Sequence, residues 1–153
     1  MTPERSTINA TTLPSLYAAG YSLNQQFQAS GFVLACFPGQ STCNEVASGF
    51  GQTGGIAVEN SPGGNGPFEY LLVDQYVPGV DIMQGSLSGQ ITTGGTPEFL
   101  ALNATRSDVF VADNQSLDVA EYTFPGGQLV RKFTPNSSGQ IFGVATSPAG
   151  TYF

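Results

Sequence analysis

The sequence predicts an all-β fold of repeated four-stranded antiparallel sheets, and three observations support this prediction. The chain has 153 residues, the length of one ordinary domain, and its 20 Gly and 10 Pro leave little room for long helices. Residues 2–11 (TPERSTINAT) and 96–105 (TPEFLALNAT) both contain TPE, four further residues and NAT. Hydrophobic residues also alternate along short segments such as 108–114 (DVFVADN), which places side chains on one face of a sheet.

The repeat continues along the chain at a nearly constant period. Its anchors are Asn9, Asn60 and Asn103, each seven residues after a Thr, and Ser147, which takes the same position in IFGVATS at 141–147. The anchors lie 51, 43 and 44 residues apart. A period of about 40–45 residues suits the four-stranded blade of a β-propeller better than it suits an all-helical repeat.

Each repeat contains its expected strands in the same order. An inner strand ends at the anchor, two alternating strands follow, and a turn leads to a short outer strand. The expected second, third and outer strands are 15–21, 31–37 and 37–46 in the first repeat, 70–76, 80–85 and 85–93 in the second, and 108–114, 118–124 and 124–133 in the third. The first repeat is the least regular, because Arg5, Ser6 and Thr7 stand where the third repeat has apolar residues.

We therefore expect one domain over residues 1–153, a partial β-propeller of about three blades plus the first strand of a fourth. The blades are expected at about 2–50, 51–94 and 95–138, and the fourth begins at about 139–153. Propellers typically close with 4–8 blades. We expect either a piece of a longer propeller or self-association of two copies that completes the ring, favoured by uncovered side chains such as Phe142 and Val144.

The chain also resembles a known group of proteins. The segments GGIAVE (54–59), YLLVDQ (70–75), VFVADN (109–114) and VAEYTFPGGQLVRKF (119–133) are similar to secreted bacterial β-propellers of the NHL and YncE-like type. In those proteins blocks of the form G-(I/V)-A-V-D and L-Y-V-A-D recur with an outer strand of the form Y-P-G-G-x-L-V. The resemblance implies a propeller in an exported protein, extracellular or periplasmic, and leaves the activity open because this scaffold has many functions.

Composition excludes several classes of function. Lys and Arg number four against eleven Asp and Glu, and the net charge is −7, so we expect no nucleic-acid partner and no anionic membrane surface. No apolar run approaches the roughly 20 residues of a membrane span, and the first fifteen residues lack the apolar centre of a signal peptide. Histidine is absent, which removes Ser-His-Asp and Cys-His catalysis and imidazole zinc sites.

Two cysteines flank the turn FPGQST at 37–42. Cys36 falls on an expected third strand and Cys43 on the outer strand, roughly opposite each other. Neighbouring antiparallel strands bring Cα atoms to about 4.5 Å, which is within disulfide range. We expect a Cys36–Cys43 disulfide formed in an oxidising compartment, with two reduced buried thiols as the alternative.

Acidic residues recur at equivalent positions of the repeats. Asp74 and Asp113 end the second strands, with Asn114 following, while Glu4 and Glu98 lie in the connection that leads into an inner strand. In a propeller these connections emerge on one face, so we expect the five residues to share a ligand-binding mouth. Carboxylates suit calcium, for which Glu4 and Glu98 would be the ligands. The alternative is that Asp caps a turn and Glu is merely solvated.

The anchor Asn residues have two interpretations. Asn9 and Asn103 begin Asn-x-Thr triplets, which are glycan acceptor patterns. The position also takes Asn60 and Ser147, which are not acceptors. We therefore expect these side chains to hydrogen bond the backbone and close the turn after the inner strand.

Three function classes remain. The first is a non-catalytic propeller module that binds an unknown protein or small-molecule ligand and needs no cofactor. The second is a calcium-dependent lactone hydrolase that resembles the SMP-30/gluconolactonase group, although the Glu-Gly-Pro stretch of that group is missing here. In that group the metal polarises the lactone carbonyl and activates water. The third is a structural repeat protein of the cell envelope.

Overall fold

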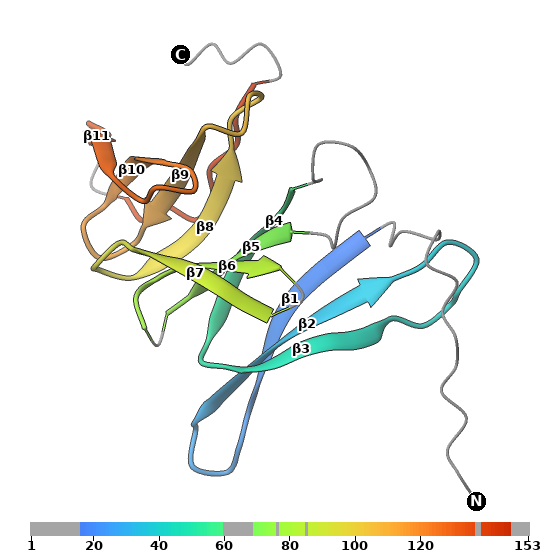
Figure 1. The fold of residues 1–153 in the computed structure, drawn as a ribbon. Coiled ribbons are helices and arrows are strands. Elements are labelled where there is room, and N and C mark those ends of the chain that lie inside the picture. The colour runs from blue at the N-terminus through green and yellow to red at the C-terminus, as the bar shows by residue number, and fades with distance from the viewer. Residues whose placement is uncertain (1–15, 60–68, 76, 85, 137–138, 148–153) are drawn as a thin grey trace, which may run out of the picture.

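The computed structural model describes residues 16–59, 69–75, 77–84, 86–136 and 139–147. These residues form eleven β-strands and no helix, which confirms the all-β prediction. The strands make three antiparallel sheets (Figure 1). No helix in the described ranges is long and apolar enough to cross a membrane.

The first sheet has three strands and the other two have four, each paired in chain order. The strands are β1 (Leu16–Leu23), β2 (Ala29–Cys36) and β3 (Asn44–Phe50); β4 (Thr53–Glu59), β5 (Glu69–Asp74), β6 (Gly79–Gln84) and β7 (Ser86–Thr92); and β8 (Pro97–Leu102), β9 (Asp108–Asp113), β10 (Asp118–Thr123) and β11 (Leu129–Phe133). β5 and β9 thus belong to different sheets, as equivalent strands of different blades must. The inner strand expected near residues 2–9 lies outside the described residues.

The middle sheet is covered on both faces, and alternation along β5 shows how. Leu71 and Val73 pack with Val109 and Val111 of the third sheet in one core cluster. Tyr70 and Leu72 belong to a second cluster with Val33 of the first sheet, and the rings of Tyr17 and Tyr70 lie 5.3 Å apart. Successive side chains of a strand point to opposite faces, so one hydrophobic strand can serve two interfaces.

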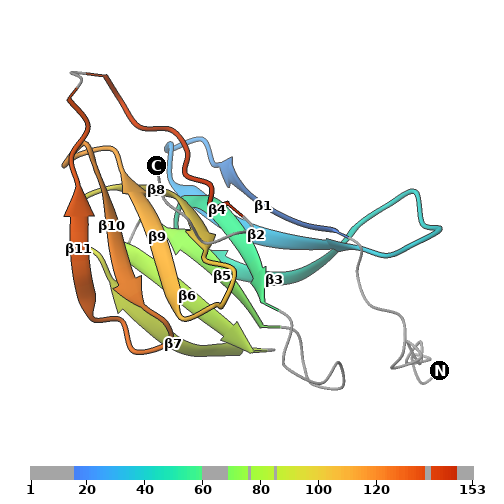
Figure 2. The same ribbon diagram turned by 90° about the horizontal axis from the view of Figure 1, so that it is seen from above.

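The inner strands β4 and β8 approach closely enough to require glycine. A Cβ added at Gly54 would lie 2.2 Å from the carbonyl oxygen of Glu98, and one at Gly55 would lie 2.9 Å from the Cα of Phe99. The beginnings of β4 and β8 therefore lie side by side (Figure 2). Because of this contact, the inner strands of the second and third sheets begin at the same end of the molecule.

The segment expected as the inner strand of a fourth blade, 141–147, is not a strand within the described residues. It nevertheless lies beside β8, because the Thr146 hydroxyl donates a hydrogen bond to the Leu102 carbonyl at 2.5 Å, and these residues are equivalent in the repeat. An inner strand pairs with the second strand of its own blade, and no such partner lies in the described ranges. Phe142 is 63% exposed.

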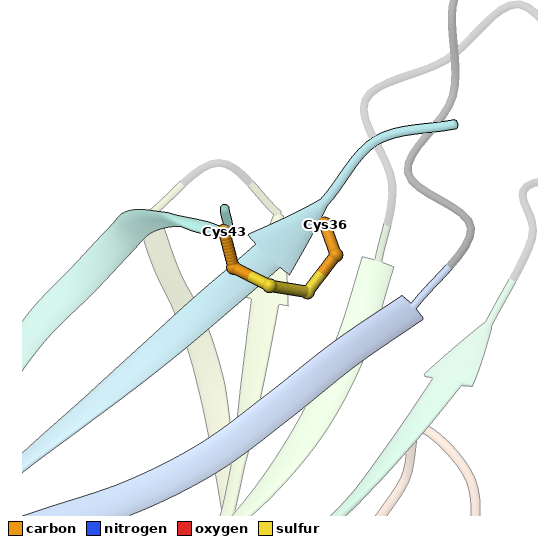
Figure 3. Close-up of a disulfide and its surroundings, with 2 residues drawn as sticks. All are labelled: Cys36 and Cys43. Atoms are coloured by element: carbon orange, nitrogen blue, oxygen red, sulfur yellow. A yellow bond between two sulfur atoms is a disulfide. The ribbon is translucent and has the colours of Figure 1, made fainter. Parts of the chain in front are cut away.

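The predicted disulfide is confirmed (Figure 3). Cys36 ends β2 and Cys43 directly precedes β3, with Cα atoms 4.3 Å apart, next to the Ala35–Asn44 pair. β2 runs from Ala29 to Cys36, so the disulfide closes one end of the β2–β3 pair and the β1–β2 turn lies at the other, roughly 20 Å away.

Candidate functional site

One end of the molecule gathers the connections that precede the inner strands and follow the second strands. Thr53 pairs with Asp74, and Pro97 pairs with Asp113. Because the beginnings of β4 and β8 lie side by side, Asp74 and Asp113 lie at the same end. We call this end, formed by the β3–β4, β5–β6, β7–β8 and β9–β10 connections, the mouth face.

The connections of the mouth face are tied together in the same way in both four-stranded sheets. The Gln75 amide donates to the Gln52 carbonyl at 3.0 Å, and the Asn114 amide donates to the Thr96 carbonyl at 2.9 Å. Each bond links the end of a second strand to the residue just before an inner strand. The same backbone hydrogen bond thus recurs at equivalent positions of the two repeats.

Asp113 has the role of a turn cap. Its Oδ1 accepts hydrogen bonds from the Gln115 and Ser116 amides, both at 2.8 Å. The carboxylate also fills the space beside Gly95, where an added Cβ would lie 2.0 Å from Oδ2. This geometry matches the turn interpretation of Asp113.

Asp74 lies near a second buried carboxylate, Asp81, which the sequence did not single out. The Gln90 Nε2 donates to the Asp81 Oδ1 at 2.7 Å. Burial raises the pKa of the Asp81 carboxyl, the Gln90 hydrogen bond opposes this, and the neighbouring charge of Asp74 adds to it. The two residues occupy diagonal positions on β5 and β6, a relation that depends on register and not on sequence spacing.

Of the other expected mouth residues, Glu98 and Asn114 lie in the described part of the chain. Glu98 is a half-buried residue of β8. Asn114 is also half-buried, and its Oδ1 has no hydrogen-bond donor among the described residues. Glu4 lies outside the described residues. In the part of the chain that the structure describes, no group of three or more Asp, Glu or Cys is placed to hold a metal ion.

The mouth face contains a hollow of about 620 Å³ that the sequence did not predict. It is lined by Phe27, Gln28, Ala29, Gln52, Gln75 and Thr96. None of these side chains is charged. The volume falls within the roughly 300–1,000 Å³ of small-molecule sites. The hollow therefore brings together three glutamines, a threonine and an aromatic ring from four separate connections.

The β1–β2 hairpin forms the wall of this hollow. The Thr53 hydroxyl donates to the Gly20 carbonyl at 2.6 Å, and a Cβ at Gly31 would lie 2.4 Å from the Gly51 carbonyl oxygen. Gly20 and Gly31 of the hairpin therefore lie beside the start of β4. The pairing of β1 with β2 continues past Gly20 to Leu23, three residues or roughly 10 Å further, before the turn. Figure 1 shows this hairpin extending away from the rest of the molecule.

The hairpin turn holds Phe27 in an unusual conformation. The Asn24 carbonyl accepts the Phe27 amide at 3.0 Å, and the Asn24 Oδ1 accepts the Gln26 and Gln28 amides at 2.9 Å. Phe27 has φ +59° and is 83% exposed. The left-handed residue of such a turn is ordinarily Gly or Asn. The available sequence signal was the Gln-rich NQQFQ segment, which has no counterpart in the other repeats.

The turn interpretation of Asn103 is confirmed. Its Oδ1 accepts the Ser107 and Asp108 amides at 2.9 and 3.2 Å, and its Nδ2 donates to the Ser107 hydroxyl and the Asp108 carboxylate. The side chain is buried and fully engaged, which is incompatible with a glycan on this nitrogen. The equivalent Asn9 lies outside the described residues.

Comparison with known proteins gives similarity at the level of the fold. No family model and no curated protein sequence matches the chain. Among solved structures, it is similar to Kuenenia stuttgartiensis hydrazine synthase, with TM-score 0.51 and 18% identity over 61% of this chain and 26% of that one. It is also similar to a chain in the nidogen/laminin complex, with TM-score 0.61 and 10% identity over 84% of this chain and 47% of that one. The chain therefore spans less than half of either matched chain.

These likenesses rest on low identity and concern architecture alone. Together with the three antiparallel sheets and their face-to-face packing, they establish a β-propeller-like fold of which this chain forms a part.

Proposed function

We propose that this chain is a non-catalytic β-propeller module that binds a ligand on its mouth face. The observation that carries the proposal is the hollow of about 620 Å³, because its lining comes from four connections that only the fold brings together. Convergent polar groups in a concave site are the usual sign of ligand binding.

The partners of the buried carboxylates and the lining of the hollow support binding rather than catalysis. Asp113 accepts two backbone amides and Asp81 accepts the Gln90 carboxamide, so both carboxylates have structural partners. The sequence contains no histidine. General acid–base work needs a titratable group within hydrogen-bond reach of the substrate, and the lining of the hollow supplies none.

The same lining indicates an uncharged ligand. Amide and hydroxyl groups can donate and accept hydrogen bonds without selecting a charge. The net charge of −7 disfavours anions over the whole surface. We further propose that the module works in an exported protein, since the Cys36–Cys43 disulfide persists best in an oxidising compartment.

Amide NMR of the labelled chain tests this function. The panel consists of methyl glycosides, capped dipeptides and small dicarboxylates at millimolar concentration. We expect at least one neutral compound to shift amides at 27–29, 52, 75 and 96, and a Gln52→Ala/Gln75→Ala variant to lose these shifts. Gln84→Ala, an exposed glutamine at the far end of β6, is the matched control. If no compound shifts these amides, the binding proposal is wrong.

Two other expectations can be measured on the same protein. Calcium-dependent hydrolysis of a simple lactone would favour the SMP-30-like alternative over a binding module. Ring completion by a second copy stays a prediction, and sedimentation velocity over a range of concentrations measures it.

A further inference from the structure

We propose that the ligand of the mouth face is a neutral saccharide whose ring stacks on Phe27 while the carboxamides of Gln52 and Gln75 bind its hydroxyls. This inference rests on the proposed binding function and names the class of ligand. The backbone conformation of Phe27 is not explained by the fold alone.

Phe27 occupies a backbone position that disfavours it. A φ of +59° brings the Cβ of an L-residue close to the following carbonyl oxygen, which glycine avoids. The Asn24 side chain holds the turn in this geometry through backbone amides, and the side chain of Phe27 makes none of these bonds. Phenylalanine at this position therefore destabilises the hairpin relative to glycine.

Packing within the protein does not offset this cost. The chain has two other non-glycine residues with positive φ, Arg106 and Leu117, in its described part, and both are half-buried. Phe27 is 83% exposed and is the most exposed large hydrophobic residue of the described ranges. A strained residue that makes little contact with its own protein points to a function outside the fold.

The groups around the ring match the two surfaces of a sugar. A pyranose ring has an apolar face of C–H groups and an edge of hydroxyls that both donate and accept hydrogen bonds. Phe27 offers a flat apolar face at the rim of the hollow. Gln52, Gln75 and Thr96 offer carboxamides and a hydroxyl in its lining, and Asn24 Nδ2 holds the Gln28 carboxamide at 2.8 Å.

Two features favour a neutral saccharide over a peptide or an acidic sugar. A peptide is usually recognised along an open strand edge with side-chain pockets, or by charge. Here the lining comes mainly from turns and connections and holds no charge. The buried Asp74 and Asp113 at the same face, together with the net charge of −7, disfavour a carboxylate-bearing sugar.

The test uses saturation-transfer and amide NMR with three classes of probe: neutral disaccharides (maltose, cellobiose and N,N′-diacetylchitobiose), glucuronate, and a capped Ala-Phe dipeptide. We expect at least one neutral disaccharide to shift amides at 27–29, 52 and 75 and to receive saturation on its ring C–H protons. Phe27→Gly should weaken its affinity about tenfold, whereas Phe27→Tyr should rescue it to within about threefold of the original chain. Leu129→Gly, which removes an exposed side chain on β11, should leave the affinity unchanged.

The outcomes separate the two proposals. If the dipeptide or glucuronate shifts the mouth amides and no disaccharide does, the saccharide proposal is overturned and the binding module stands. If Phe27→Gly binds a disaccharide as tightly as the original chain, the stacking role of Phe27 is overturned. If no probe of either panel shifts these amides, both proposals fail. An amide spectrum of each variant first shows that it is folded, and its affinity is measured afterwards.

Discussion

Replacing Phe27 by glycine should make the protein more stable. At φ +59° the substitution relieves roughly 1–2 kcal/mol of left-handed strain. It also gives the unfolded chain more backbone freedom, which costs about 0.5–1 kcal/mol. Because the ring is 83% exposed, little buried area is lost. The net gain is about 0.5–1 kcal/mol, or a rise in Tm of about 1–4 °C for a chain of this length.

Thermal unfolding by circular dichroism and urea titration measure this change. Leu129→Gly is the control, because it truncates an exposed hydrophobic residue of β11 that does not have a positive φ, and glycine there should lower stability by about 0.5–1 kcal/mol. A Phe27→Gly variant that is destabilised by 1 kcal/mol or more would show that the ring packs on the protein. Phe27 would then have a structural role, and its exposure would not indicate a ligand.

Three further predictions test other parts of the structure. Gly54→Ala should cost about 3 kcal/mol or more in urea unfolding, because its Cβ would lie 2.2 Å from the Glu98 carbonyl oxygen and β4 would have to move from β8; a loss below 1 kcal/mol would contradict this packing. Cys36→Ser/Cys43→Ser should cost about 2.5 kcal/mol for a loop closed over a separation of 7 residues, and a reducing agent should lower the Tm of the original chain alone. The raised pKa of Asp81 means that the folded state holds its proton more tightly, so its charge destabilises the fold at neutral pH and this penalty disappears as pH falls below the unfolded-state pKa. Asp81→Asn should therefore be more stable than the original chain at pH 7 and lose that advantage near pH 3; an advantage independent of pH would refute the assignment.

The repeat in the sequence was enough to predict the fold because its two signals are local. Alternation along 70–76 and 108–114 gave the second strands, and the shared anchor positions gave their order. The disulfide followed because Cys36 and Cys43 flank one short turn. The segment at 141–147 shows the limit of this reasoning. It has the repeat pattern and lies beside β8. It is not a strand, because a strand also needs a pairing partner, and the pattern of a segment does not show whether it has one.

The candidate site was harder to predict because it depends on strand register and on how far each turn extends from its sheet. Asp113 was placed correctly at a strand end, yet only its hydrogen bonds show that it caps the turn. The proximity of Asp74 and Asp81 requires the pairing of β5 with β6. The hollow depends on which residues of the β1–β2 hairpin contact the start of β4. Because these residues are Gly20 and Gly31, the turn with Phe27 extends beyond the other turns. No repeat equivalence encodes that offset.

The turn hydrogen bonds described above also affect how this surface can change. Asn24, Asn103 and Asp113 each close their own turn with bonds to residues two to five positions further along the chain. Because the first residue of each turn supplies these hydrogen bonds, the exposed side chains that follow do not have to supply them. Mutations in those residues can therefore alter what the surface recognises while the sheets beneath keep their packing, which makes these turns suitable sites for grafting new recognition sequences.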